Sequence, residues 1–136
     1  MPQAPQPTPS TSARHVFVYG TLRRGGDNDI NRLLPAPVYL GVGSTPGTMY
    51  HFGRYPGVLL GGPGVVQGEV YAITPELERV LDEIEEIYPQ QTNEYFKRDI
   101  VVEVDGKSVP CIVYEINAEY VMGKPPIHSG DWVRHR

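Results

Sequence analysis

Short apolar runs separated by glycine and proline characterise the chain from residue 15 onward. The first run, residues 15–19, combines aromatic and β-branched side chains and ends at Gly20, a pattern typical of a buried strand. Turns are expected at residues 53–57 and 61–64, where glycine and proline cluster. Further strands are expected over residues 38–52 (one or two strands), 58–60 and 65–73. We expect these strands to pair antiparallel in a strongly curved sheet or small barrel.

One segment has helical periodicity. Thr74 is the predicted N-cap, Pro75 suits the first helical position, and Pro89 is expected to end the helix. An apolar stripe at helical spacing is expected to pack on the sheet. Its members are Leu77, Val80, Leu81, Ile84, Ile87 and Tyr88.

The acidic residues of this helix differ in direction. At about 100° per residue, Asp82 and Glu86 fall nearly opposite the apolar stripe and are expected in solvent. Glu83 and Glu85 fall on its two flanks, where a carboxylate can reach the rim of a cavity. Periodicity alone leaves both glutamates as candidates for chemistry.

The last third of the chain predicts a β-hairpin followed by irregular structure. Residues 95–104 and 109–116 are the expected strands, joined across Asp105-Gly106, a strong turn dipeptide. Beyond residue 117, glycine and proline preclude a long regular element. We expect residues 129–132 to hold this segment against the domain.

A polar cluster at residues 27–31 resembles a calcium loop in composition only. Arg32 stands where such a loop needs glycine, and Val38 where it needs a bidentate glutamate. We therefore reject calcium and expect the cluster to cap a short helix that carries Ile30, Leu33 and Leu34.

The chain of 136 residues is long enough for one hydrophobic core. Residues 1–14 contain prolines among Gln, Ser and Thr and are predicted to form a disordered Pro-rich tail, followed by one domain over residues 15–136. The tail matches a Pro-x-x-Pro ligand, but its composition alone explains the match. A role of the tail as a contact for a partner protein stays open.

Charge and cysteine content exclude several classes of protein. The formal net charge of -4 argues against binding to nucleic acid or anionic membrane. No apolar stretch approaches the ~20 residues of a membrane span, and no secretory signal is evident. Cys111 is the only cysteine, which favours a reducing, cytoplasmic location. The oligomeric state is left open.

Metal or thiol chemistry has little support. The four histidines show no close pair on one element, so no metal ligand set is predicted. Cys111 lies in a strand with buried character, where an inert packing role is expected.

The turn after the first strand is the better candidate for ligand binding. Gly20 and Gly25-Gly26 allow positive φ values or close backbone approach, so N–H groups here can face an anion. An ordinary tight turn explains the same residues. The adjacent Arg23 and Arg24 are expected to edge a pocket or face solvent.

An ordered set of motifs resembles the gamma-glutamylcyclotransferase superfamily, most closely its small gamma-glutamylamine cyclotransferase branch. The resemblance covers residues 15–132. It rests on VFVYGTLRRG at residues 16–25, YPG at 55–57, VQGEVY at 66–71, LDEIE at 81–85 and YFKR at 95–98.

This resemblance implies an α+β fold, a small antiparallel β-barrel with flanking helices. It also implies that Glu85, the last residue of the LDxxE motif, is the catalytic acid/base, which calls for a raised pKa in a partly dry site. Tyr95 and Tyr114 are candidates for the pocket wall. The implied substrate-binding residues are Tyr19, Gly20, Thr21 and Leu22.

The implied reaction is the attack of a γ-glutamyl α-amine on its own γ-carbonyl, which gives 5-oxoproline and a free amine or amino acid. The expected partner is a small γ-glutamyl substrate, and no cofactor is expected. The alternative is a non-catalytic binding module for a small carboxylate-bearing metabolite, built on the same cavity.

Overall fold

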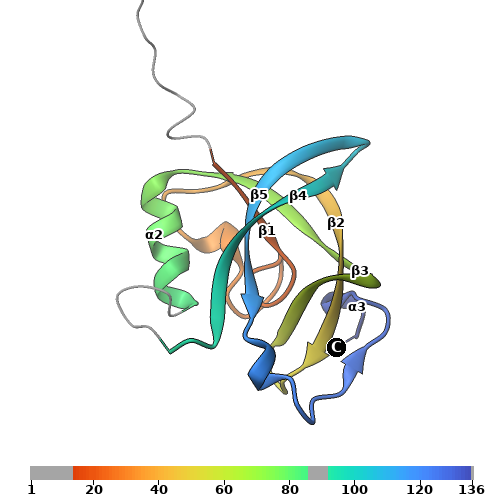
Figure 1. Ribbon diagram of the computed structural model, residues 1–136. Coiled ribbons are helices and arrows are strands. Elements are labelled where there is room, and N and C mark those ends of the chain that lie inside the picture. Colours follow the sequence, from red (N-terminus) through yellow and green to blue (C-terminus); the bar gives the residue numbers. More distant parts are fainter. Residues whose placement is uncertain (1–13, 86–91, 136) are drawn as a thin grey trace, which may run out of the picture.

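A closed five-stranded β-barrel forms the centre of the computed structural model, which describes residues 14–85 and 92–135 (Figure 1). The strand order is β3-β1-β5-β4-β2, and pairing of β2 with β3 closes the barrel. The strands are β1 (Arg14–Val18), β2 (Val38–His51), β3 (Pro56–Ile73), β4 (Tyr95–Val104), β5 (Lys107–Ile116) and β6 (Pro126–Ile127). The predicted barrel fold is confirmed; β1 and β5 form a parallel pair within an otherwise antiparallel sheet.

Four helical segments accompany the barrel in the described part of the chain. They are the 3₁₀ helices η1 (Ile30–Arg32) and η2 (Ala118–Tyr120) and the α-helices α2 (Pro75–Ile84) and α3 (Trp132–His135). Figure 1 shows α2 outside the barrel. None of the helices formed by the described residues is long and apolar enough to cross a membrane.

Strands β1 and β5 are buried on both faces. Phe17 of β1 belongs to the core cluster inside the barrel, whereas Val16 and Val18 belong to a second cluster formed with α2. In β5, Cys111 faces the barrel cluster and Ile112 the α2 cluster. Burial on both faces explains why the first strand is a continuous apolar run, without the alternation of a half-exposed strand.

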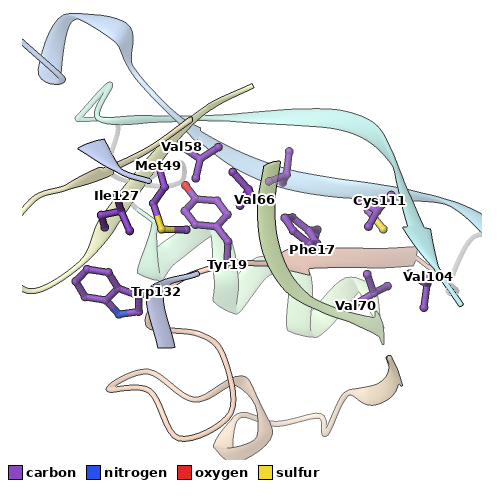
Figure 2. Close-up of a cluster of buried hydrophobic side chains, with 12 residues drawn as sticks. Phe17, Tyr19, Met49, Val58, Val66, Val70, Val104, Cys111, Ile127 and Trp132 are labelled. Carbon is purple, nitrogen blue, oxygen red and sulfur yellow. The ribbon is translucent and has the colours of Figure 1, made fainter. Parts of the chain in front are cut away.

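The core inside the barrel includes side chains from β1 and from α3, the first and last elements of the described chain (Figure 2). Tyr19 lies in the middle of this cluster, between Met49 on one side and Phe17 on the other. Trp132 of α3 is 3% exposed and belongs to the same cluster. The backbone N–H of Gln67 donates a hydrogen bond of 2.8 Å to the Gly130 carbonyl. The expectation that residues 129–132 hold the last segment against the domain is confirmed.

Strand β3 is longer than predicted. The sequence predicts a turn at residues 61–64 between two short strands, but β3 runs from Pro56 to Ile73. Opposite it, Pro46 pairs with Val65 and Gly47 with Leu60, so residues 61–64 form an irregularity within one paired strand. The glycines are therefore used for a bulge in a bent strand, and the chain does not reverse there.

The predicted hairpin is confirmed, and its second strand begins at Lys107, two residues earlier than predicted. Tyr95 pairs with Ile116 and Val104 with Lys107 across a two-residue turn. Asp105 and Gly106 have φ values of 51° and 78°, as a type I′ turn requires.

Helix α2 begins as predicted, with the Thr74 hydroxyl accepting a hydrogen bond of 3.2 Å from the Leu77 N–H. Leu77 and Leu81 are fully buried in the α2 cluster. The helix ends at Ile84, and Glu85 is its C-cap with φ −87° and ψ 3°. The rest of the predicted helix, up to Pro89, lies outside the described residues.

The predicted tail also lies outside the described residues, apart from Arg14. Arg14 is already the first residue of β1 and pairs with Ile73. The sheet thus begins one residue before the expected domain boundary. Of the predicted short helix with Ile30, Leu33 and Leu34, only the 3₁₀ turn η1 forms; it ends at Arg32, and Leu33 is its extended C-cap. The predicted capping is confirmed, because the Asp29 carboxylate accepts a hydrogen bond of 2.9 Å from the Asn31 N–H.

The Cys111 thiol is predicted to be unreactive in the folded protein. It is 3% exposed, and burial raises its pKa to about 12, so at pH 8 only about one thiol in ten thousand is ionised. An unfolded thiol with a pKa of about 8.5 is ionised in roughly a quarter of molecules. Labelling with a thiol-reactive disulfide reagent at pH 8 is expected to be slow in buffer and fast in denaturant. Equal rates in the two conditions would contradict this burial.

Candidate active site

A cavity of about 330 Å³ opens where the end of β1, the last residues of α2 and the first residues of β4 meet. Glu85 and the turn at residues 20–22 both line it. Tyr19, Tyr95 and Tyr114 line it as well. The structure therefore brings the residues that the sequence singled out to one place, although they are far apart in the chain.

Hydrogen bonds hold the loop that follows β1 in a compact form. The N–H of Arg23 donates to the Gly20 carbonyl at 3.0 Å, and the N–H of Gly26 donates to the Arg23 carbonyl at 2.9 Å. The N–H of Arg24 donates to the Glu69 carboxylate at 3.0 Å. In the described part of the chain, the N–H groups of residues 20–22 have no protein acceptor. They are the donors of this turn that remain for a ligand.

Close packing explains two glycines of this loop. A Cβ at Gly20 would lie 2.7 Å from Cγ of Pro56, and one at Gly26 would overlap the carbonyl oxygen of Thr21. Close approach, and not positive φ, is therefore what requires glycine at these two positions. The turn is held against Pro56, which lines the same cavity.

Glu85 lies at the end of α2, where its N–H donates a hydrogen bond of 2.9 Å to the Leu81 carbonyl. The residue is half-buried and its side chain lines the cavity. Glu83, the other candidate, is exposed and does not line the cavity. Exposure and position at the cavity thus distinguish two glutamates that periodicity alone left equivalent.

Two cavity tyrosines donate their hydroxyl protons to backbone carbonyl oxygens. Tyr19 donates to the Tyr114 carbonyl, and Tyr95 donates to the Pro56 carbonyl at 2.9 Å. Burial, and after it the nearby Glu85 charge, raises the pKa of Tyr19 well above its usual value. Burial, then the neighbouring Tyr19 and Glu85, likewise raises the pKa of Tyr95. Both phenols are neutral at physiological pH, so neither acts as a base.

The prediction that Asp82 lies in solvent is wrong. Its side chain is 13% exposed, accepts a hydrogen bond of 2.7 Å from the Tyr114 hydroxyl, and pairs with Lys97 at 2.9 Å. The helical-direction argument fails because Lys97 of β4 and Tyr114 of β5 reach a second side of this short helix and cover it. Glu86, the other residue predicted in solvent, lies outside the described residues.

Arg23 is also placed differently from the prediction. It is 8% exposed and pairs with Glu69 at 3.1 Å and with Asp131 at 2.9 Å, away from the cavity lining. Glu69 additionally accepts a hydrogen bond of 2.7 Å from the Tyr71 hydroxyl. Arg23 thereby ties the loop after β1 to β3 and to the segment before α3. Arg24 is exposed, with its guanidinium over a tyrosine ring.

Other lining residues were missed by the sequence analysis. Tyr55, which donates a hydrogen bond to the Glu94 carboxylate, belongs to the YPG motif and could have been found from it. Glu94 carries no signal of its own, because its position depends on how the chain enters β4. Asp27, Asn28 and Arg54 also line the cavity.

No group of three or more His, Cys, Asp or Glu side chains within residues 14–85 and 92–135 is arranged to hold a metal ion.

Comparison with known proteins identifies the class to which this fold and cavity belong. Residues 16–134 match the family described as gamma-glutamyl cyclotransferase, AIG2-like. The match covers most of the chain, and the protein belongs to this family. The resemblance inferred from the motifs is confirmed.

Two relatives and one structure illustrate the similarity. The chain is 36% identical over 86 residues to the gamma-L-glutamyl-butirosin B gamma-glutamyl cyclotransferase of Niallia circulans, covering 62% of this chain and 54% of that protein. It is 33% identical over 119 residues to a Vibrio cholerae protein provisionally named a gamma-glutamylcyclotransferase, covering 86% of this chain and 93% of that protein. The crystal structure of an AIG2-like protein of Mus musculus superposes with a TM-score of 0.67 at 29% identity, covering 86% of this chain and 87% of that chain. The chain thus spans about half the length of the Niallia relative.

Replacing Arg23 is predicted to destabilise the fold far more than replacing its neighbour. Arg23→Met leaves the buried Glu69 carboxylate without its ion pair, which costs about 3–5 kcal/mol. Arg24→Met removes an exposed cation–π contact worth about 1 kcal/mol or less and leaves its backbone bond to Glu69 intact. Urea unfolding of the two variants measures the difference. Equal losses would show that the buried ion pairs do not hold the loop.

Proposed function

We propose that this protein is a gamma-glutamyl cyclotransferase that converts a γ-glutamylamine or related γ-glutamyl compound into 5-oxoproline and a free amine or amino acid. The observation that carries the proposal is that Glu85 and residues 20–22 line one cavity, and that the N–H groups of residues 20–22 have no acceptor among the described residues. A carboxylate base opposite a cluster of backbone donors is the arrangement that an acyl transfer with proton movement needs.

Glu85 acts first as the base in this scheme. Its carboxylate takes a proton from the substrate's α-ammonium group, and the neutral amine then attacks the γ-carbonyl carbon. The new C–N bond closes a five-membered ring and leaves an oxyanion on the former carbonyl oxygen. Glu85 then returns its proton to the departing nitrogen as the original C–N bond breaks. The ring nitrogen still carries two hydrogens after the attack, and it passes one of them through the Glu85 carboxylate to the released amine, which leaves as an ammonium ion. Charge and atoms then balance without a redox step.

The turn at residues 20–22 has the complementary role. Its backbone N–H groups can hold the substrate's carboxylate or the developing oxyanion. Backbone donors fixed in advance cost little reorganisation during the reaction, and the packing of Gly20 on Pro56 keeps the turn in place.

Positioning accounts for much of the expected acceleration, because nucleophile and electrophile belong to one molecule. Well-oriented intramolecular reactions reach effective molarities of roughly 10⁵–10⁸ M. A cavity of about 330 Å³ is suited to a small substrate held in a folded-back conformation. The neutral state of Tyr19 and Tyr95 leaves proton transfer to a carboxylate.

The relatives support this proposal. The Niallia circulans relative is named a gamma-L-glutamyl-butirosin B gamma-glutamyl cyclotransferase, and the aligned region includes more than half of the present chain. The identity of the amine or amino acid released by the present protein is part of the proposal.

Glu85→Gln is predicted to abolish most of the activity while leaving the fold intact. Loss of the acid/base is expected to lower kcat/KM by about 100-fold or more. The measurement is release of 5-oxoproline from a panel of γ-glutamylamines and γ-glutamyl amino acids. Glu83→Gln is the matched control, because Glu83 is exposed on the same helix, and its activity is expected to stay close to that of the wild type.

Equal turnover by the wild type and Glu85→Gln would refute the assigned role of Glu85. A different result would favour the binding-module alternative: thermal stabilisation by γ-glutamyl compounds in both proteins with no 5-oxoproline from either.

A further inference from the structure

The Tyr114 hydroxyl donates its proton to the carboxylate of Asp82. It lies 2.7 Å from Oδ1 of Asp82, and a carboxylate oxygen carries no hydrogen to donate, so the phenol donates. A phenol has one proton, and here Asp82 receives it. Towards a ligand in the cavity, the Tyr114 oxygen can therefore act only as an acceptor.

Asp82 is itself held in place. Its second oxygen, Oδ2, accepts a hydrogen bond of 2.9 Å from Lys97, which also reaches Glu78 at 2.7 Å. Burial lowers the pKa of Lys97, but the bonds to Glu78 and Asp82 outweigh this effect and raise it above its usual value. Lys97 is thus a fixed cation that orients Asp82 with one oxygen towards Tyr114.

Two other tyrosines that line the cavity, Tyr19 and Tyr95, also use their hydroxyl protons within the protein. Tyr19 and Tyr95 donate their protons to carbonyl oxygens of the protein. These three lining tyrosines spend their hydroxyl protons on protein oxygens and leave only acceptor capacity for a ligand, whereas the turn at residues 20–22 supplies backbone donors. Such a division suits a ligand with a cationic amine at one end and a carboxyl or carbonyl oxygen at the other.

We propose that Asp82 is a positioning residue that acts through Tyr114: by taking the phenol proton, it leaves the Tyr114 oxygen to accept a hydrogen bond from the substrate's α-ammonium group. This inference rests on the proposed function. Tyr114 holds one N–H of the α-nitrogen while Glu85 removes another proton. The nitrogen lone pair that is released is then directed at the γ-carbonyl carbon.

Binding to an inactive background tests the contact directly. In Glu85→Gln, calorimetry compares γ-glutamylmethylamide with its analogue lacking the α-amine. Adding Tyr114→Phe is expected to lower the affinity for the amine-bearing ligand roughly ten- to hundredfold, the range for a hydrogen bond to a charged group. The affinity for the analogue is expected to stay nearly unchanged.

Asp82→Asn is expected to act in the same direction. Lys97 will select the amide oxygen of the new side chain, so its NH₂ group faces Tyr114 and turns the phenol proton towards the cavity. The affinity for the amine-bearing ligand is then expected to fall at least as much as it does in Tyr114→Phe. In a Tyr114→Phe background, Asp82→Asn is expected to add little, because Asp82 acts through the missing oxygen.

Turnover gives the second readout. With Glu85 present, Tyr114→Phe and Asp82→Asn each lower kcat/KM, and the double variant resembles Tyr114→Phe alone. Glu78→Gln is the matched control: it removes the other carboxylate bound to Lys97 but keeps the Asp82–Tyr114 hydrogen bond. Its kinetics are expected to stay close to those of the wild type, even if its stability falls as much as that of Asp82→Asn.

The outcomes separate the two proposals. Release of 5-oxoproline by the wild type and not by Glu85→Gln would support the proposed function. The inference about Asp82 would still be wrong if Tyr114→Phe lowered the affinity for both ligands equally, or if the effects of Asp82→Asn and Tyr114→Phe were additive. If no compound is turned over but the amine-specific loss of binding is found, the inference stands and the proposed function fails.

Discussion

The packing of α2 on the outer faces of β1 and β5 is the constraint on which the candidate site depends. Leu77 and Leu81 are buried against Val16, Val18 and their neighbours in one cluster. This packing places the end of the helix, and with it Glu85, beside the turn that follows β1. Because β1 and β5 form the parallel pair of the barrel, the helix covers two strands that are buried on both faces.

Ion pairs of Arg23 also hold the turn that follows β1. Arg23 joins it to Glu69 of β3 and to Asp131 before α3, so the last segment of the chain helps to hold the loop. Loss of Arg23 would leave the carboxylates of Glu69 and Asp131, which are both largely buried, without their cation. The backbone donors of residues 20–22 are therefore held by a hydrophobic helix contact on one side and an ion-pair network on the other.

Much of the fold, but less of the site, can be predicted from this sequence. Local signals give the Asp105-Gly106 hairpin and the Thr74 cap because each depends on neighbouring residues only. Residues 61–64 were predicted as a turn because glycine permits both a reversal and a bulge. Asp82 was placed in solvent because one helix cannot reveal what Lys97 and Tyr114, from other strands, contribute. Glu85 needed the family resemblance to be preferred to Glu83.

The most direct test of the account is a crystal structure of Glu85→Gln with γ-glutamylmethylamide. The account predicts the ligand inside the cavity, with its α-nitrogen beside residue 85 and a carboxylate or γ-carbonyl oxygen at the N–H groups of residues 20–22. A ligand bound elsewhere, or one whose α-nitrogen and oxygen atoms lie far from both groups, would contradict it.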